Sequence, residues 1–484
     1  MKKIQTPLFY LFIIAINILF FWRSFNISLF KDDFFFFEIS RINNVGAFLN
    51  FFSPIRTYSF KPLASEVFYF LINRNIFLGH LIVFITYFVG LLYLYKSIIF
   101  ISKNKYFAQL SILIYSLSSA HVFQLYWLAT YQEILVFTAL SASFYFFLQR
   151  KTLISSIFYV CALLSKETAI LYIIFLLFIE LLTLSKARRL NMKSILFIFR
   201  RLIIYGLLSA LFFCIYQYSL HYVTALDNYK MDLNFRRILN NSMWYFLWSW
   251  GVPSFLPDYM TSIFSAPINE FWKLWREPYV QLYFYLFGIY IFSFLSVFIA
   301  YIVTNRHITK KFFVLSLGAI ACFFIYLGPV LFFPHRWMVR LTLPLIFISL
   351  LQSYILICYF ESKRVFRYLA GILIVIYLAM SMAGTKLHEN ASTYTLESSI
   401  TKRAEAVFKD INRFNNCSTI YIKDPKMMKM SSWDGSEKIA LTFFGNSARS
   451  YFFPRRKDLN LVYEFQTRTQ PIGSCVVGAD EFLR

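Results

Sequence analysis

Several features are scarce or missing in this chain, and each absence excludes a class of protein. Acidic residues number 24 against 48 Lys and Arg, and charged residues make up only 15% of the 484, fewer than a soluble domain normally carries. No glycine-rich phosphate loop is found, so we expect no nucleotide-binding domain. The six cysteines show no metal-binding spacing, and no internal repeat stands out.

Apolar side chains dominate instead. They make up 59% of the chain, aromatic residues make up 21%, and the mean hydropathy is +0.58. These values indicate a polytopic membrane protein. The formal charge of +24 lies in short basic clusters between apolar runs, which is typical of the positive-inside bias. We therefore expect a membrane as partner and no nucleic acid.

Apolar runs of spanning length predict an all-α membrane module with about eleven transmembrane helices. The first run lacks a small-residue cleavage site, so we expect it to stay as a span. Most basic residues of the short connections fall on one side, which predicts a cytoplasmic N-terminus and an extracytoplasmic C-terminus. The predicted spans lie near 7–25, 79–101, 107–121, 131–148, 153–165, 168–184, 202–224, 283–304, 312–332, 341–360 and 368–383.

This orientation divides the chain into a transmembrane module, residues 1–383, and an extracytoplasmic C-terminal domain, residues 384–484. The module has two long exoplasmic loops, 26–78 and 225–282. Residues 241–250 of the second loop are apolar and rich in tryptophan, which predicts an interfacial or re-entrant helix with its tryptophans in the headgroup layer.

The C-terminal domain is predicted to be small and of mixed α/β type. We expect a helix over residues 401–416 and strands over 419–422 and 439–444. Cys417 and Cys475 lie in this domain, and the sequence is equally compatible with a disulfide between them and with two free thiols.

Charged residues near the membrane surface are candidates for a functional site, because burying them without a partner is expensive. On the predicted topology they gather at the exoplasmic side. Carboxylates there can accept a proton and cations can hold a phosphate. The candidates are Asp32, Asp33, Lys61, His121, Glu133, Lys166, Glu167, Arg336 and Arg340.

Each of these residues also has a purely structural interpretation. Lys166 and Glu167 would cap a turn, and His121 would be an interior histidine. The arginines would reach for lipid headgroups, Glu133 would pair with a neighbouring cation for packing, and Lys61 would be solvated in its loop.

Short motifs around these residues carry a resemblance. Two acids follow the first span directly, residues 58–63 read Tyr-Ser-Phe-Lys-Pro-Leu, and residues 163–169 read Leu-Leu-Ser-Lys-Glu-Thr-Ala. His121 is followed by Trp127 and Glu133, and residues 334–340 read Pro-His-Arg-Trp-Met-Val-Arg. With these motifs the chain resembles the GT-C superfamily of polyprenyl-phosphate-sugar-dependent glycosyltransferases, especially the protein O-mannosyltransferase-like branch.

The motif matches cover residues 1–185 well. The remainder of the chain resembles the family only in its predicted topology. It departs from the branch at Phe123 and Tyr131, where an acid and an arginine are common. These departures leave the sugar and the acceptor open.

The resemblance implies a GT-C-like fold and an inverting glycosyltransferase on the exoplasmic face. Asp32 would be the catalytic base, with Asp33 orienting the acceptor or serving as the base itself. Lys61, Lys166, Arg336 and Arg340 would hold the donor phosphate, and His121, Glu133 and Glu167 would orient these cations or contact the sugar. The donor would be a polyprenyl-phosphate-linked sugar, and the acceptor a lipid, glycan or protein hydroxyl. No cofactor is implied with certainty, and a requirement for a divalent metal stays open.

Other functions fit parts of the same pattern. A lipid-linked glycan polymerase or ligase would share the donor, and a transporter or flippase would use the cations without activating a hydroxyl. A membrane scaffold would leave the clustered charges without a role. Enrichment in Phe, Ile, Lys and Asn is typical of an AT-rich bacterial genome, so we expect a bacterial inner (plasma) membrane.

Overall fold

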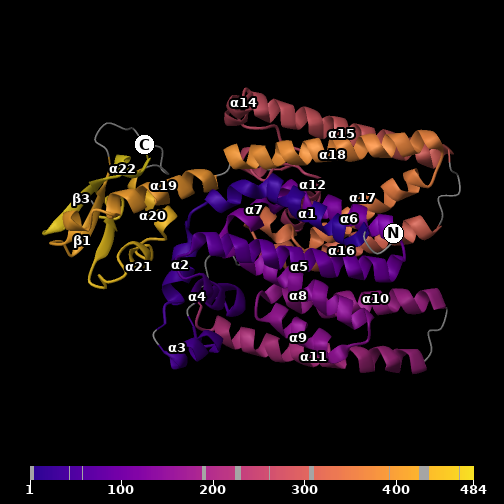
Figure 1. The fold of residues 1–484 in the computed structure, drawn as a ribbon, viewed down its shortest axis with the longest axis horizontal. Helices are drawn as coiled ribbons and strands as arrows, with labels where there is room; N and C mark the ends of the chain where they lie inside the picture. Colours follow the sequence, from indigo (N-terminus) through magenta and orange to yellow (C-terminus); the bar gives the residue numbers. More distant parts are fainter. Residues whose placement is uncertain are drawn as a thin grey trace.

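The computed structural model is a bundle of long helices with a small domain at one end (Figure 1). It describes residues 5–42, 44–56, 58–187, 192–223, 231–260, 262–304, 310–391, 393–424, 435–467 and 469–483. Helix α2 (Asp32–Ile39) and helix α19 (Thr393–Phe408) lie where the small domain meets the bundle, which we call the domain end. The N-terminus lies at the opposite end (Figure 1).

Seven helices among the described residues are long and apolar enough to cross a membrane, so the chain is an integral membrane protein. All seven overlap predicted spans, although the helix at Met192–Leu220 begins earlier than predicted and that at Arg364–Ala391 ends later. They contain α1 (Gln5–Phe21) with η1 (Trp22–Asn26), α5 (Ile76–Ser102), α8 (Tyr131–Leu148) with η5 (Leu128–Thr130), α11 (Met192–Leu220), α15 (Pro278–Thr304), α16 (Lys310–Leu327) with η8 (Gly328–Phe332), and α18 (Arg364–Ala391).

The other four predicted spans are shorter helices. They are α6 (Lys105–Ser116), α9 (Thr152–Leu163), α10 (Tyr172–Ala187) and α17 (Pro344–Phe360). Short helices and turns link the bundle: α3 (Val45–Leu49), η2 (Asn50–Phe52), η3 (Leu63–Val67, a π-helix), α4 (Phe68–Ile72), η4 (Ser119–His121), α7 (Val122–Tyr126), η6 (Glu167–Leu171), α12 (Phe235–Ser249), α13 (Leu256–Tyr259), α14 (Asn269–Trp275) and η9 (Met338–Leu341).

Asparagine side chains cap the N-termini of several of these helices. Asn44, Asn75, Asn104 and Asn234 each accept a hydrogen bond from a backbone N–H in the first turn of α3, α5, α6 and α12. Such caps satisfy donors that the helix itself leaves without partners. The start of each helix is therefore encoded locally.

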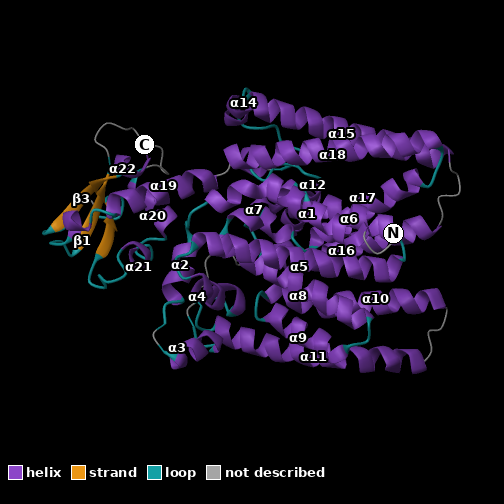
Figure 2. Ribbon diagram, in the orientation of Figure 1, coloured by secondary structure: helices purple, strands orange, loops and turns teal. Residues whose placement is uncertain are grey.

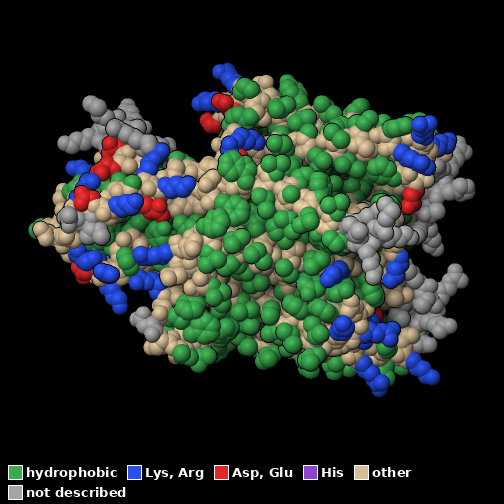
Figure 3. All heavy atoms as spheres, in the orientation of Figure 1, with side chains coloured by type: hydrophobic (Ala, Val, Ile, Leu, Met, Phe, Trp, Pro, Cys, Tyr) green, Lys and Arg blue, Asp and Glu red, His purple; other side chains and the backbone are tan. Residues whose placement is uncertain are grey.

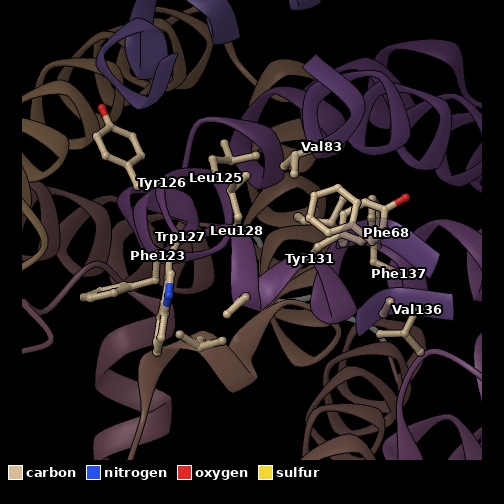
Figure 4. Packing of buried hydrophobic residues seen from close by; sticks show 14 of the residues in the cluster. Phe68, Val83, Phe123, Leu125, Tyr126, Trp127, Leu128, Tyr131, Val136 and Phe137 are labelled. Carbon is tan, nitrogen blue, oxygen red and sulfur yellow. The ribbon is translucent and has the colours of Figure 1, made fainter. Parts of the chain in front are cut away.

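The largest buried cluster runs from α1 through the bundle into the C-terminal domain, and part of it surrounds the connection from α7 to α8. Figure 4 shows Leu125 and Leu128 next to one another in this region, and the rings of Phe68 and Tyr131 stack with centroids 4.1 Å apart. The cluster fixes residues 122–131 beneath the domain end. Ala129, whose backbone N–H binds Asp33, lies in this supported segment.

The outside of the bundle is apolar between its two ends. Figure 3 shows a broad surface of hydrophobic side chains, with Lys and Arg gathered near the ends. This distribution is expected for a protein whose middle faces hydrocarbon.

Helix α12 contains the tryptophan-rich run, and two of its tryptophans pack inside the protein. Trp244 and Trp248 are buried, whereas Phe235 and Leu239 are exposed. The tryptophan face of α12 packs on η8 and η9, and burial of these large rings outweighs their preference for the interface.

The C-terminal domain carries the only sheet among the described residues, coloured orange in Figure 2. Its strands are β1 (Thr419–Lys423), β2 (Asn460–Tyr463) and β3 (Ser474–Gly478), and β1 pairs in parallel with both others, Thr419 facing Asn460 and Ser474. The helices are α19, η10 (Ile411–Phe414), α20 (Ser436–Phe443), α21 (Arg449–Phe452) and α22 (Asp480–Leu483).

Two predictions for this domain need correction. The expected strand over 439–444 is helix α20, because two parallel strands need a crossover between them and Ile439, Ala440 and Phe443 bury one helical face. The helix expected over 401–416 is α19, which begins earlier and ends at Phe408. The predicted strand at 419–422 is confirmed.

Cys417 and Cys475 are joined by a disulfide, with their Cα atoms 5.7 Å apart. The bond ties the segment before β1 to β3. Of the two alternatives left open by the sequence, a disulfide or two free thiols, the structure therefore has the disulfide.

Candidate functional site

The two aspartates lie in the first turn of α2, at the domain end. Lys31 precedes the helix with a φ of 51°, and its backbone N–H donates to the carbonyl of Thr442 in the C-terminal domain at 2.6 Å. Carboxylates are favourable at a helix N-terminus, where the dipole is positive. The C-terminal domain therefore touches the residue next to the acids.

Asp33 is fully buried and bound on both oxygens. It accepts hydrogen bonds from the backbone N–H of Ala129 at 2.7 Å, from the backbone N–H of Phe30 at 3.0 Å and from the Tyr69 hydroxyl. Burial raises the pKa of Asp33 to about 7, and the three donors oppose this rise. Asp33 therefore ties α2 to η5 and α4, and it has no oxygen directed at solvent.

Asp32 lies in a different environment. It is partly exposed, and no hydrogen bond or ion pair joins its carboxylate to any residue that the structure describes. Burial raises the pKa of Asp32, while Lys31 and Lys61 lower it. Its carboxylate is therefore available to another molecule and faces two cations.

Lys61 and Glu167 join two loops that the sequence places far apart. The Lys61 ammonium lies 3.3 Å from the Glu167 carboxylate, and the backbone N–H of Leu63 donates to the carbonyl of Leu164 at 3.2 Å. Burial alone would raise the pKa of Glu167, but Lys61 and Lys166 lower it to about 2. Glu167 is therefore ionised at neutral pH.

Lys166 and Glu133 form a buried ion pair directly beneath this contact. Lys166 follows α9 and Glu133 lies in the first turn of α8, so the pair links two apolar helices. Burial lowers the pKa of Lys166, whereas Glu133 and Glu167 raise it. Each charge compensates the desolvation of the other.

Tyr245 of α12 connects this pair to the late arginine segment. Burial raises the pKa of its phenol, Arg340 lowers it and Glu133 raises it, so the phenol faces both charges. Its oxygen also accepts from the backbone N–H of Trp337 at 3.2 Å. Arg340 donates to the carbonyl of His335 at 3.2 Å.

Arg336 faces the short helix α13. Burial lowers the pKa of its guanidinium and Asp258 raises it, but the two groups form no ion pair within the described residues. The Nη1 atom of Arg336 is buried without a hydrogen-bond partner. Arg336 therefore retains a donor for an anion.

His121 lies outside this charged network. It is buried between Tyr115 and Tyr87, with ring centroids 4.7 and 5.4 Å away, and its Nε2 lies 2.9 Å from the carbonyl of Tyr115. This geometry agrees with the structural interpretation, an interior histidine. The other eight candidates all lie in or beside the network.

The sequence analysis did not select four residues that lie near the aspartates: Lys31, Tyr394, Glu397 and Lys438. Glu397 of α19 is buried and lies 3.1 Å from the Lys31 ammonium and 2.7 Å from that of Lys438. Tyr394, one turn earlier, lies beneath Lys31 with the ammonium 5.8 Å from its ring. The adjacency of Lys31 to Asp32 was a usable signal, but nothing in the sequence indicated docking of α19.

Groups of three or more His, Cys, Asp or Glu side chains placed to hold a metal are not found in the described part of the chain. A scan against protein-family models finds none that matches this chain, and no curated protein matches it either.

Proposed function

We propose that this protein is an integral-membrane inverting glycosyltransferase that moves a sugar from a polyprenyl-phosphate-linked donor to a hydroxyl acceptor. One observation carries the proposal: Asp32 presents a carboxylate that no described residue binds, beside Lys31 and Lys61, at the end of an apolar bundle. A free base next to cations is the arrangement that such a transfer needs.

Asp32, rather than Asp33, is the base in this proposal. Asp33 already accepts three hydrogen bonds and therefore acts by holding α2 in place. Asp32 takes the proton of the acceptor hydroxyl as the acceptor oxygen bonds to the anomeric carbon. The bond from that carbon to the phosphate oxygen breaks on the opposite face, which inverts the anomeric centre.

The leaving phosphate needs cations, because it takes up the electron pair of the broken bond. Arg336 fits this role best, since its Nη1 donor has no partner in the part of the chain that the structure describes, and Lys61 and Arg340 lie in the same network. Lys166 is already paired with Glu133 and supports the site from below. Glu133 and Glu167 orient the lysines.

The proposed topology has eleven spans, a cytoplasmic N-terminus and an extracytoplasmic C-terminal domain in a bacterial inner membrane. Basic residues in the turns at the opposite end support it through the positive-inside rule, and so does the disulfide in the C-terminal domain. These turns carry Lys103, Arg150, Lys151, Lys363 and Arg364.

A lipid-linked glycan polymerase or ligase is the second candidate, because it would use the same base and the same phosphate site. A transporter or flippase fits less well, since the candidate charges lie around one end of the bundle and not along its depth.

The test is transfer of radiolabelled sugar from a panel of undecaprenyl-phosphate donors in membranes carrying wild type or Asp32→Asn. We expect the variant to lose transfer by a factor of at least about 10² while expression and donor binding stay unchanged. Glu38→Gln is the matched control on α2, because Glu38 pairs with Arg449 at 3.4 Å and not with the network. Full activity in Asp32→Asn would refute the proposal.

A further inference from the structure

A shallow cavity of about 260 Å³ lies at the end of the bundle opposite to the aspartates. It is lined by Lys96, Ile99, Phe100 and Lys103 near the end of α5 and by Tyr145 of α8. Helices α5 and α8 pack along each other and lie side by side in Figure 1. Lys96, Ile99 and Phe100 of α5 are spaced i, i+3 and i+4, so they share one helix face, and Lys103 follows directly as the C-cap of this helix.

The charge of this cavity is not compensated. Neither Lys96 nor Lys103 forms an ion pair with a described residue, and no described carboxylate lines the cavity. The lysines lie against aromatic rings instead: Lys96 is 5.4 Å from the Tyr93 ring and 5.6 Å from the Tyr145 ring, and Lys103 is 4.4 Å from that of Phe100. These contacts hold both ammonium groups at the cavity while leaving their donors free.

The depth of the cavity indicates what can reach it. Helix α5 has 27 residues, about 40 Å at 1.5 Å per residue, so it exceeds a hydrocarbon core of about 30 Å. Lys96 lies about 9 Å before the helix end, and Lys103 follows that end directly. Lys103 therefore lies in the headgroup layer, where lipid phosphates are concentrated and tyrosines are favoured. The long flexible side chain of Lys96 can extend to this layer from its position inside the helix.

We propose that this cavity binds the phosphate group of an anionic membrane lipid. Lys96, near the end of α5, and Lys103, its C-cap, both line the cavity, and the Tyr145 ring of α8 lines it as well. This site is independent of the proposed transferase reaction, because none of its residues belongs to the network around Asp32. With the proposed orientation it would select lipids of the cytoplasmic leaflet.

The test is native mass spectrometry of the purified full-length protein, with phosphatidylglycerol or phosphatidylcholine added at equal concentration. We expect wild type to retain phosphatidylglycerol preferentially, and Lys96→Gln/Lys103→Gln to reduce this retention by about tenfold. Lys363→Gln removes the same charge at the same end but outside the cavity, and we expect it to change retention less than twofold. Equal retention of the two lipids by wild type, or equal losses in both variants, would overturn the proposal.

The single variant Lys103→Gln guards against a folding artefact, because Lys103 is exposed and its loss leaves the bundle intact. We expect it to reduce phosphatidylglycerol retention severalfold, with an unchanged melting temperature in the absence of added lipid. Unchanged retention in this variant would also count against the site.

Discussion

Lys31 and Glu397 form an ion pair of 3.1 Å between the residue that precedes Asp32 and the first helix of the C-terminal domain. Glu397 is buried and also binds Lys438 at 2.7 Å. On the same face of α19, the Ser398 hydroxyl accepts from the backbone N–H of Ser28 at 2.7 Å and the Thr401 hydroxyl donates to the carbonyl of Leu29 at 2.7 Å. The C-terminal domain thus holds the loop that presents Asp32.

Glu397→Gln should loosen this contact, because a neutral amide cannot compensate two ammonium groups. We expect a loss of about 1–3 kcal/mol in stability and faster hydrogen exchange in residues 28–31. Glu481→Gln is the control, since Glu481 pairs with Arg413 on the surface of the domain, where such pairs contribute little. Similar effects of the two variants would contradict the docking role.

The buried pair of Lys166 and Glu133 gives a second prediction. Lys166→Met or Glu133→Gln leaves one buried charge alone and should cost about 3–5 kcal/mol each. The double variant should cost less than the sum, because no unpaired charge remains. Thermal unfolding in detergent measures the difference, and additive losses would show that the two side chains do not depend on each other.

The raised pKa of Asp33 should make the stability of the protein depend on pH. Burial raises its pKa to about 7 in the folded protein, above the value of about 3.9 of an unfolded chain. Between these values the folded state binds more protons than the unfolded state, so stability falls as pH rises from about 4 to 7. The melting temperature should decline over this range.

Asp33→Asn cannot ionise and should flatten that decline. It should also lower stability at every pH, because its amide nitrogen would face the backbone N–H of Phe30. A wild-type slope that survives unchanged in the variant would assign the pH dependence to another group.

In helix α12 the buried tryptophans and the exposed apolar residues should have different roles, the first in stability and the second in donor binding. Trp244 and Trp248 are each 1% exposed, so replacing either by Ala should cost about 3–5 kcal/mol and affect long and short donors alike. Phe235 and Leu239 are 74% and 49% exposed and contact lipid or the isoprenoid chain in our proposal. Phe235→Ser/Leu239→Ser should therefore raise the KM for long-chain donors more than for short ones, and equal effects on both would count against it.

The sequence by itself determined the membrane character and the positions of the apolar helices, because both follow from apolar run length and local capping residues such as Asn75 and Asn104. It also predicted that charged residues from distant segments gather near one end of the bundle. Lys61 with Glu167 and Lys166 with Glu133 meet there, because a membrane leaves charged side chains few other places.

Only the tertiary structure decided which of the two aspartates is bound by its described neighbours. Asp32 and Asp33 are identical in type and adjacent in sequence, and they differ because Ala129 and Tyr69, brought beside α2 by packing, bind one and not the other. The same holds for the burial of Trp244, for helix α20 in place of a strand, and for Glu397 beside Lys31. Each depends on contacts between segments far apart in the chain, which no local pattern encodes.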